Sequence, residues 1–233
     1  MYHEFSVVET LKTSWSVLKK NFAVVAIFSL IAFFIVFILG FVVYYVFTDS
    51  LLASIGITVL FISVSFLFLS YIKLIFKLMD KEYYDFEFKE IIPRIKMLFS
   101  YLILLILVSA LSVFLQHLIE GVNNEFTKNI LGICIGIFFE FFFLFILPIC
   151  TCFIVDDSSG PFESVNQSYY LIKGNFLKYF LLFVLVELLF FLASLTLIGV
   201  IFVIPFVNII LVVAYRKLVY SHLDVDDDIA ETN

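Results

Sequence analysis

The feature that most constrains this chain is an apolar run at residues 22–47 that contains no charged side chain. About 20 apolar residues in a helix are enough to cross the hydrocarbon core of a bilayer. Five further apolar stretches follow, at residues 51–72, 97–119, 130–155, 176–197 and 198–219. Because a helix satisfies its own backbone hydrogen bonds in lipid, the pattern predicts an all-α integral membrane protein with six transmembrane helices.

The composition agrees with lipid as the main solvent. Apolar residues make up 64% of the chain, 32 residues are Phe, and only 15% are charged, against about 25% charged residues in soluble domains. Six spans use most of the sequence, so we expect a single membrane domain at residues 1–220 and no separate catalytic domain. The acids near the end predict a solvated, acidic cytoplasmic tail at 221–233 (Asp224, Asp226, Asp227, Asp228 and Glu231).

The basic residues predict how the spans are oriented. If the N-terminus is cytoplasmic, every one of the 14 Lys and Arg residues except Lys128 falls in or beside a cytoplasmic segment. Positively charged loops remain on the cytoplasmic side. We therefore expect both termini of this multi-pass protein to be cytoplasmic.

Two segments of the chain repeat one another. Residues 9–22 and 163–176 align without a gap, so that Glu9 matches Glu163, Ser14 matches Ser168 and Trp15 matches Tyr169. A weaker copy precedes the third span, where Ile95, Lys96 and Phe99 occupy the corresponding positions. The pattern predicts three units, at about residues 5–80, 85–157 and 160–220, each built from a short amphipathic helix and a transmembrane hairpin.

The short helices are expected to lie at the membrane surface. In the first, apolar residues recur at three- and four-residue steps and form one stripe (Phe5, Val8, Leu11, Trp15 and Leu18). The last copy does the same with Phe162, Val165, Tyr169 and Ile172. Helices with Trp or Tyr on the apolar side and Lys at one end are typical of the headgroup region. Anchoring of the bundle is the simplest role for them, with gating or partner docking as the alternatives.

The C-terminal third carries a pattern that resembles a known group. The sequence IVDDSSGPFESVNQSYYLIKGNFLKYF and the closing AYRKL are similar to the YciC-like uncharacterised bacterial membrane proteins and to the membrane domain attached to some glycerophosphoryl diester phosphodiesterases. The resemblance implies a six-helix inner-membrane protein of unassigned activity, without the catalytic barrel of those enzymes. The positions that match are Asp156, Asp157, Gly160, Ser168, Lys173, Asn175, Phe176, Tyr215 and Arg216.

Two acids lie inside predicted spans. At about 1.5 Å per helical residue, Glu140 lies about 23 Å and Glu187 about 16 Å from the cytoplasmic ends of their spans. Carboxyl groups at such depths usually face the protein interior and are often functional. Asn208 in the sixth span, and Gln116 or His117 in the third, are candidate partners. A neutral pair bonded between helices, a proton or cation relay and a contact to a ligand headgroup all remain open.

Two prolines interrupt predicted spans. Pro148 and Pro205 each free one backbone carbonyl, which commonly produces a kink in a membrane helix. Asn208, one turn after Pro205, is a candidate donor for the freed carbonyl. Packing is the simpler explanation for both prolines, and broken helices at a transport site are the alternative.

Catalytic sequence patterns are missing. There is no nucleophile elbow, zinc-protease or phosphate-loop motif, and no basic patch with interleaved aromatics that would bind nucleic acid. Cys134, Cys150 and Cys152 share one apolar segment, which favours a packing role over a disulfide or metal site. We therefore expect no enzyme activity, cofactor or metal. The favoured hypothesis is a structural or accessory membrane component that contacts lipid and other membrane proteins; the alternative is a small transporter or lipid-handling protein that uses Glu140 and Glu187.

Overall fold

The computed structural model describes residues 5–47, 50–80 and 88–231, and these residues form helices and short connections without a strand. Six helical segments are long and apolar enough to cross a membrane, which confirms the predicted all-α fold and the number of spans. They are Phe22–Tyr45, Leu51–Asp80, Phe88–Glu120, Glu125–Asp156, Phe176–Ser194 and Phe202–Ser221.

The chain begins with a short helix followed by a long hairpin. Helix α1 spans Val7–Lys20, α2 spans Phe22–Val46 and α3 spans Ser50–Asp80. The Ser6 hydroxyl accepts a hydrogen bond from the Glu9 amide at 3.5 Å and caps α1. The break between the short helix and the first span lies at residue 21, directly before the predicted start of that span at residue 22.

The middle of the chain forms a second hairpin. It contains the 3-10 helix η1 (Phe88–Ile91), α4 (Ile95–Glu120), α5 (Glu125–Phe141), the π-helical turn η2 (Phe142–Ile146) and α6 (Leu147–Asp156). The expected short helix of the middle unit falls partly on residues 81–87, which lie outside the described residues. The described part before α4 is a single 3-10 turn.

The fourth span is not one regular helix. The π-helical turn η2 separates α5 from α6, and Pro148 lies in the first turn of α6, where its missing N–H interrupts the ladder. The hydroxyl of Tyr179 donates to the carbonyl of Phe145 at 3.0 Å. A side chain from another helix thus supplies a hydrogen bond within the irregular turn, as irregular backbone in a membrane requires.

The last third repeats the order of short helix and two spans. Helix α7 covers Pro161–Lys173, α8 covers Phe176–Ser194 and α9 covers Leu197–Glu231. The predicted boundary at residue 220 does not coincide with a helix end, because α9 continues without interruption through the acidic segment. The candidate span within α9 ends at Ser221, and the acidic segment from there to Glu231 continues as helix.

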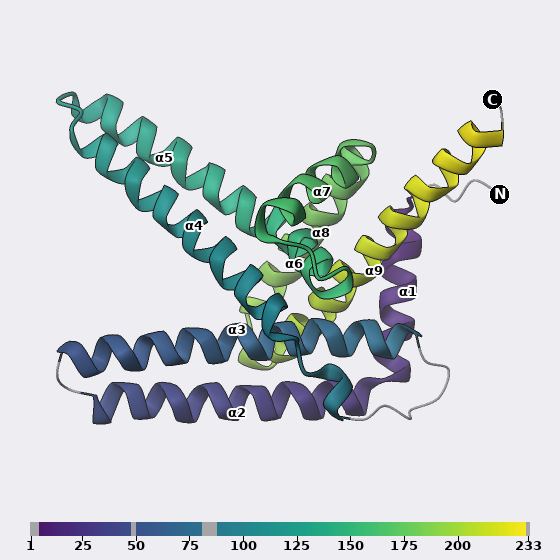
Figure 1. Cartoon of the computed structure of the whole chain (residues 1–233), viewed down its shortest axis with the longest axis horizontal. Helices are drawn as coiled ribbons and strands as arrows, with labels where there is room; N and C mark the ends of the chain where they lie inside the picture. The colour runs from purple at the N-terminus through teal and green to yellow at the C-terminus, as the bar shows by residue number, and fades with distance from the viewer. Residues whose placement is uncertain (1–4, 48–49, 81–87, 232–233) are drawn as a thin grey trace.

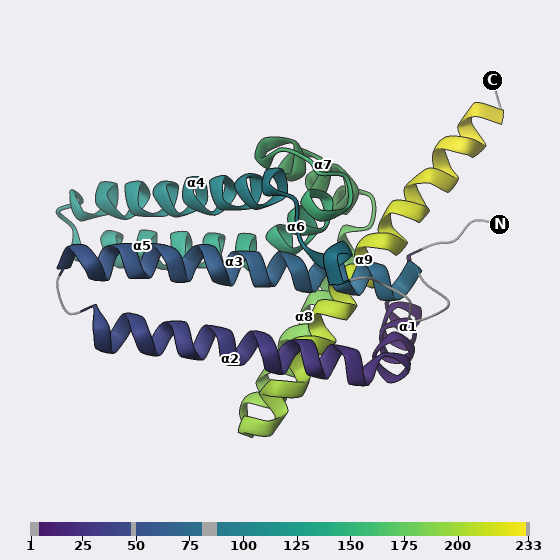
Figure 2. The same cartoon turned by 60° about the horizontal axis from the view of Figure 1, so that its bottom comes forward.

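Helices α3, α6 and α9 form the centre of the molecule, because each contacts the other two. The short segments cover this centre from outside: α1 packs on α9, η1 on α3, and α7 on α6. The two hairpins α2–α3 and α4–α5 diverge from the centre toward their loops (Figure 1), and α8 crosses beside α9 (Figure 2). The most buried side chains lie on the central helices, among them Leu69, Ile75, Ile149, Ile154, Ile209 and Ile210.

Candidate functional site

The main polar cluster lies where α3 and α6 end against α9. We call it the three-helix junction and define it by six residues: Phe76 and Asp80 of α3, Phe153 and Asp156 of α6, and Tyr215 and Arg216 of α9. Each central helix contributes two of these residues. α3 and α6 each provide one aromatic ring and one carboxylate, and Tyr215 and Arg216 of α9 contact them.

Arg216 joins α9 to α3 through two hydrogen bonds. Its Nη1 donates to Oδ1 of Asp80, and its Nη2 donates to Oδ2 of the same carboxylate at 2.9 Å. The guanidinium also lies over the ring of Phe76, with Cζ 5.1 Å from the ring centroid. A two-bond pair of this kind fixes orientation as well as distance, so α9 is held in one register on α3.

Tyr215 joins α9 to α6. Its hydroxyl donates to Oδ2 of Asp156 at 3.2 Å, and its ring meets those of Phe153 and Phe76 edge-on, with centroids 4.9 Å and 5.7 Å away. The residue is only 2% exposed. Edge-to-face aromatic contacts add to the free energy of simple burial, so Tyr215 is the side chain that connects all three helices.

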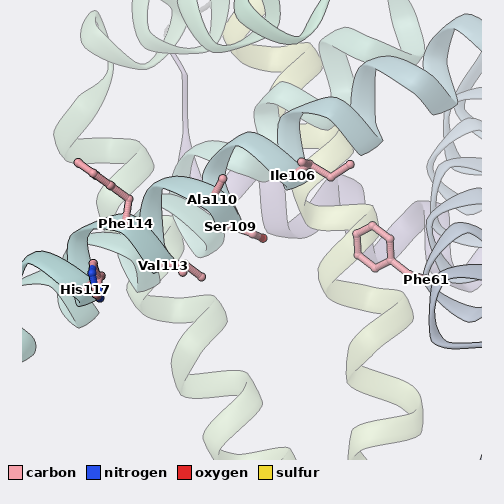
Figure 3. A pocket seen from close by; sticks show the side chains of 7 residues that line it. All are labelled: Phe61, Ile106, Ser109, Ala110, Val113, Phe114 and His117. Carbon is pink, nitrogen blue, oxygen red and sulfur yellow. The ribbon is translucent and has the colours of Figure 1, made fainter. Parts of the chain in front are cut away.

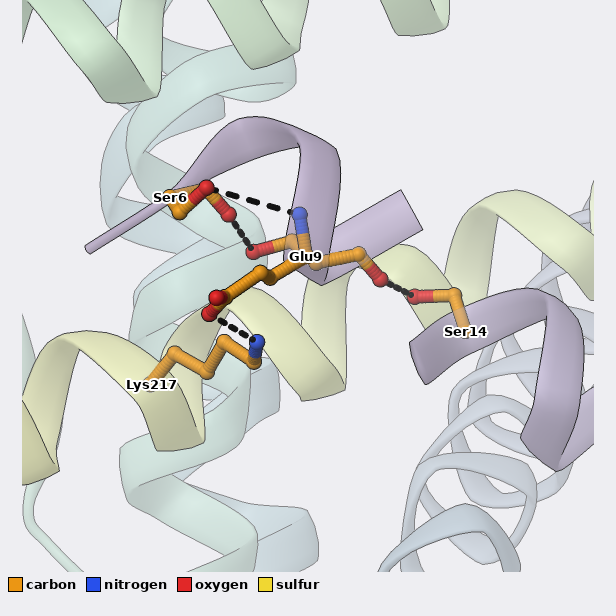
Figure 4. Close-up of polar contacts among 5 residues, drawn as sticks. Ser6, Glu9, Ser14 and Lys217 are labelled. Atoms are coloured by element: carbon orange, nitrogen blue, oxygen red, sulfur yellow. Dashed lines mark hydrogen bonds and ion pairs between the residues drawn. The ribbon is translucent and has the colours of Figure 1, made fainter. Parts of the chain in front are cut away.

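Further polar contacts surround the junction. Lys217 of α9 pairs with Glu9 of α1 across 3.4 Å, beside the cap that Ser6 gives to α1 (Figure 4). On α3, Lys77 pairs with Glu90 at 3.4 Å. These contacts tie short segments to the central helices.

The turn between α6 and α7 is acidic and strained at one position. Ser158 has a positive φ of 56°, in the left-handed region that residues with a Cβ rarely adopt. Burial, together with the charges of Asp156 and Glu163, raises the pKa of Asp157. The backbone N–H of Gly160 donates to Oε2 of Glu163 at 3.2 Å, which closes the N-terminus of α7.

Helices α1 and α7 each bury a pair of small hydroxyl residues. Thr10 and Ser14 of α1, and Ser164 and Ser168 of α7, are fully buried. The Ser14 hydroxyl donates to the Thr10 carbonyl at 2.7 Å, and the Ser168 hydroxyl donates to the Ser164 carbonyl at 2.6 Å. Because each hydroxyl bonds within its own helix, the helices can pack closely without unsatisfied polar groups.

The apolar stripe expected on the short helices is therefore only partly buried. Trp15 is 59% exposed and its counterpart Tyr169 is 57% exposed, and Val8 and Phe162 also point outward. The inward side of α1 carries Thr10, Ser14 and Leu18. Outward aromatic side chains are typical of a membrane interface, and the surface position of both helices stays a prediction.

The remaining family-like positions lie near α7 and α8. Lys173 is exposed in the last turn of α7. The side-chain amide of Asn175 donates to the hydroxyl of Ser221 at 3.3 Å, and the ring of Phe176 stacks on Phe180 at 6.2 Å. Of the motif positions, Asp156, Tyr215 and Arg216 are in the three-helix junction, whereas the others lie within α7 or close to its two ends.

The structure brings together Asp156, Tyr215 and Arg216 and adds three residues that the sequence did not single out, Asp80, Phe76 and Phe153. A signal for Asp80 was present. It is the last residue of α3, just as Asp156 is the last residue of α6. An acid at the end of the second span in two successive units marks both contacts of α9.

The intramembrane site proposed from sequence is not assembled. Glu140 is exposed on α5, Glu187 is half-buried on α8, and within the described residues no hydrogen bond or ion pair joins either to Asn208. The amide of Asn208 donates to the carbonyl of Ile204 at 2.9 Å. It does not bond to the carbonyl of residue 201, which Pro205 leaves free. Asn208 therefore satisfies its own helix.

The three cysteines lie in different surroundings. Cys134 is exposed on α5, whereas Cys150 and Cys152 are buried in α6, and all three are free thiols. Within the described ranges, no three His, Cys, Asp or Glu side chains are grouped so that they would hold a metal ion.

Comparison with known proteins gives no match to a family model, to a curated protein or to a solved structure. The class of the protein follows from its own helices. In the part of the chain that the structure describes, six segments are long and apolar enough to cross a bilayer, which makes the protein a multi-pass membrane protein.

Proposed function

We propose that this chain is a non-catalytic structural or accessory component of a bacterial inner membrane that associates with other membrane components. The observation that carries the proposal is the three-helix junction. Its charged groups pair with one another, Arg216 with Asp80 and Tyr215 with Asp156, and so serve to hold helices together. Groups that act on a substrate are instead expected to converge on an accessible cavity.

The pairwise contacts support three repeated units at about 5–80, 85–157 and 160–220. The final helices of the units, α3, α6 and α9, form the centre, and the short segment of each unit packs on the final helix of another. The matched burial of Ser14 and Ser168 agrees with this arrangement. The units thus form a ring around α3, α6 and α9 in which each depends on its neighbours.

The orientation with both termini cytoplasmic is part of the proposal. The start of α1 and the end of α9 lie on the same side of the molecule (Figure 1), as an even number of spans requires. Lys73 and Lys77 lie on α3 shortly before Asp80, and Lys217 follows Arg216 on α9. Lys128 alone follows the loop at the far end of α4, which agrees with the positive-inside rule.

We also propose that the chain is related to the YciC-like membrane proteins, because of the residues that the two share. Asp156, Tyr215 and Arg216 come from two distant parts of the motif and meet at one place. The alternative of a small transporter depends on Glu140 and Glu187. Since Glu140 is exposed and Glu187 lacks a link to it within the described chain, the arrangement favours the accessory role.

The test uses the full-length chain, tagged and expressed at native level in its own membrane. After chemical crosslinking and purification, quantitative mass spectrometry compares its partners with those of an unrelated six-span protein expressed at the same level. We expect the same membrane proteins to be enriched in every replicate. Absence of any reproducible partner would count against the proposal.

A second measurement addresses transport directly. The wild-type chain and the Glu140→Gln and Glu187→Gln variants are reconstituted in proteoliposomes that report internal pH. We expect no proton flux above that of empty vesicles in any of the three. A proton flux in the wild-type chain that either variant abolishes would establish the transporter in place of the accessory role.

A further inference from the structure

An open groove lies between the two diverging hairpins. One wall is a face of α4 from Ile106 to His117, and the ring of Phe61 on α3 stands opposite (Figure 3). The volume of the groove is about 640 Å³. It involves none of the residues of the three-helix junction, and neither Glu140 nor Glu187 lines it.

The shape of the groove follows from the order of side chains on α4. The lining residues recur at three- and four-residue steps, which places them on one face of the helix. Ser109 and Ala110 are small and form the floor, whereas Ile106 precedes them and Val113 follows. A short side chain between larger ones leaves a hollow, and its lining is almost entirely apolar.

The length of the groove matches one leaflet of a bilayer. Eleven steps along α4 from Ile106 to His117 rise about 16 Å at about 1.5 Å per residue. The hydrocarbon core is about 30 Å thick, so the chains of one leaflet fill about half of it. Because α4 ends at Glu120, three residues after His117, the groove belongs to the leaflet on the side of the α4–α5 loop.

We propose that this groove is a binding site for one acyl chain of a phospholipid from that leaflet. The chain lies along Ile106, Ala110 and Val113, with Phe61 against its other side. His117 and Glu120, whose Nδ1 and Oε2 atoms lie 3.4 Å apart and which are largely exposed, lie at the level of the headgroup. A polar pair at the mouth and an apolar wall below it are the two parts that a phospholipid requires.

A partner helix fits the groove less well than a lipid chain. A spanning helix of a second copy or of another protein is about 30 Å long and needs a contact surface along both leaflets. The groove extends over one leaflet only. Toward the other leaflet α3 and α4 pack against each other, with the rings of Phe68 and Tyr101 5.9 Å apart, and this contact closes the groove.

The test places the full-length chain in nanodiscs of phosphatidylethanolamine and phosphatidylglycerol that contain a trace of phospholipid with a diazirine near the end of one acyl chain. After illumination, mass spectrometry locates the labelled residues. We expect Phe61, Ile106 and Val113 to be labelled several-fold more than Phe33 and Phe37 of α2. Those two residues are each 60% exposed and provide the reference for general lipid contact.

Variants on α4 make the result specific. Ala110→Phe fills the floor of the groove and is expected to reduce labelling of Phe61 and Val113 several-fold. Leu111→Phe adds a ring at the next position, which is exposed and does not line the groove, and it should leave the labelling unchanged. Ser109→Leu fills the floor from the neighbouring position and replaces Ala110→Phe if that variant does not fold.

Two results would overturn the acyl-chain site. One is even labelling of all exposed apolar residues that Ala110→Phe and Ser109→Leu do not alter. The other is a change in the number of chains per nanodisc caused by Ala110→Phe but not by Leu111→Phe, which would make the groove a contact between copies. Neither result bears on the accessory role, which rests on the three-helix junction.

Discussion

Arg216 and Asp80 form a two-bond ion pair although 136 positions separate them in the chain. The guanidinium is mostly covered and also lies over the ring of Phe76, whereas the carboxylate is 45% exposed. The contact joins the first and last thirds of the protein. A substitution at the end of α3 is therefore expected to alter the position of α9 through this interaction.

Removal of this pair should destabilise the folded protein. We expect the Asp80→Asn and Arg216→Gln variants each to lower the free energy of unfolding, with a coupling between the two of about 1 kcal/mol, toward the upper end for partly exposed pairs. A double-mutant cycle measured by unfolding in mixed detergent micelles gives that coupling. Additive effects of the two substitutions would show that the pair contributes nothing.

The hydroxyl and the ring of Tyr215 should contribute separately. Tyr215→Phe removes the hydrogen bond to Asp156 but keeps the aromatic contacts, and we expect it to cost about 1 kcal/mol. Tyr215→Ala also leaves a cavity between Phe76 and Phe153 and should cost about 3–5 kcal/mol. Thermal unfolding of both variants in the same detergent checks the order. Equal losses would mean that the ring does not pack as described.

The hydroxyl residues of the short helices are expected to tolerate loss but not gain of volume. Ser14→Ala and Ser168→Ala should be close to neutral, because each hydroxyl bonds within its own helix. Ser14→Leu and Ser168→Leu should each cost about 1–3 kcal/mol by overpacking. Proteolysis and thermal unfolding measure both pairs. A marked difference between the α1 and α7 variants would argue that the two helices are not equivalent.

Asp157 should make stability fall as the pH rises through its pKa. Burial and the charges of Asp156 and Glu163 raise the pKa of this carboxyl above its ordinary value of 3.8. The folded state therefore binds the proton more tightly than the unfolded state, and protonation stabilises it. We expect Asp157→Asn to raise the melting temperature at pH 7 and to remove part of the difference between pH 7 and acidic pH. An unchanged pH profile would contradict this.

The proposed orientation predicts a simple pattern of thiol accessibility. In a Cys134→Ala background, Lys128→Cys should react with a membrane-impermeant maleimide in intact cells, whereas Ser16→Cys should react only after lysis. Cys150 and Cys152 are buried in α6 and should not interfere. Ser16 serves as the matched site because it is exposed on α1. The opposite labelling pattern would place both termini outside the cytoplasm.

The helices could be predicted from sequence because their signals are local. The apolar run at 22–47 and the repeated segments 9–22 and 163–176 gave spans and short helices close to those observed. The π-helical turn η2 could not be predicted in this way. Its irregular backbone accepts a hydrogen bond from Tyr179, which lies on another helix. No sequence pattern near residue 145 predicts that donor.

The candidate sites show the same division. Depth alone identified Glu140 and Glu187, but depth does not reveal which side of a helix faces the protein, and the two acids do not meet. Asp156, Tyr215 and Arg216 stood out through their resemblance to a family motif. Their partner Asp80 lies outside that motif. Its place at the end of α3 matches that of Asp156 at the end of α6, but only the packing of α3 against α9 shows that it pairs with Arg216.

The sequence by itself determined that lipid is the main solvent, how many apolar segments can span it and roughly where most of the long helices lie, because hydrophobicity acts over a few residues. The tertiary structure decided which helices form the centre, that α1 turns Trp15 outward and Ser14 inward, and that α9 is held by α3 and α6. These features depend on contacts between residues far apart in the chain, such as Tyr215 with Asp156 across 59 positions and Arg216 with Asp80 across 136. Packing sets these contacts, and no local property of the chain does.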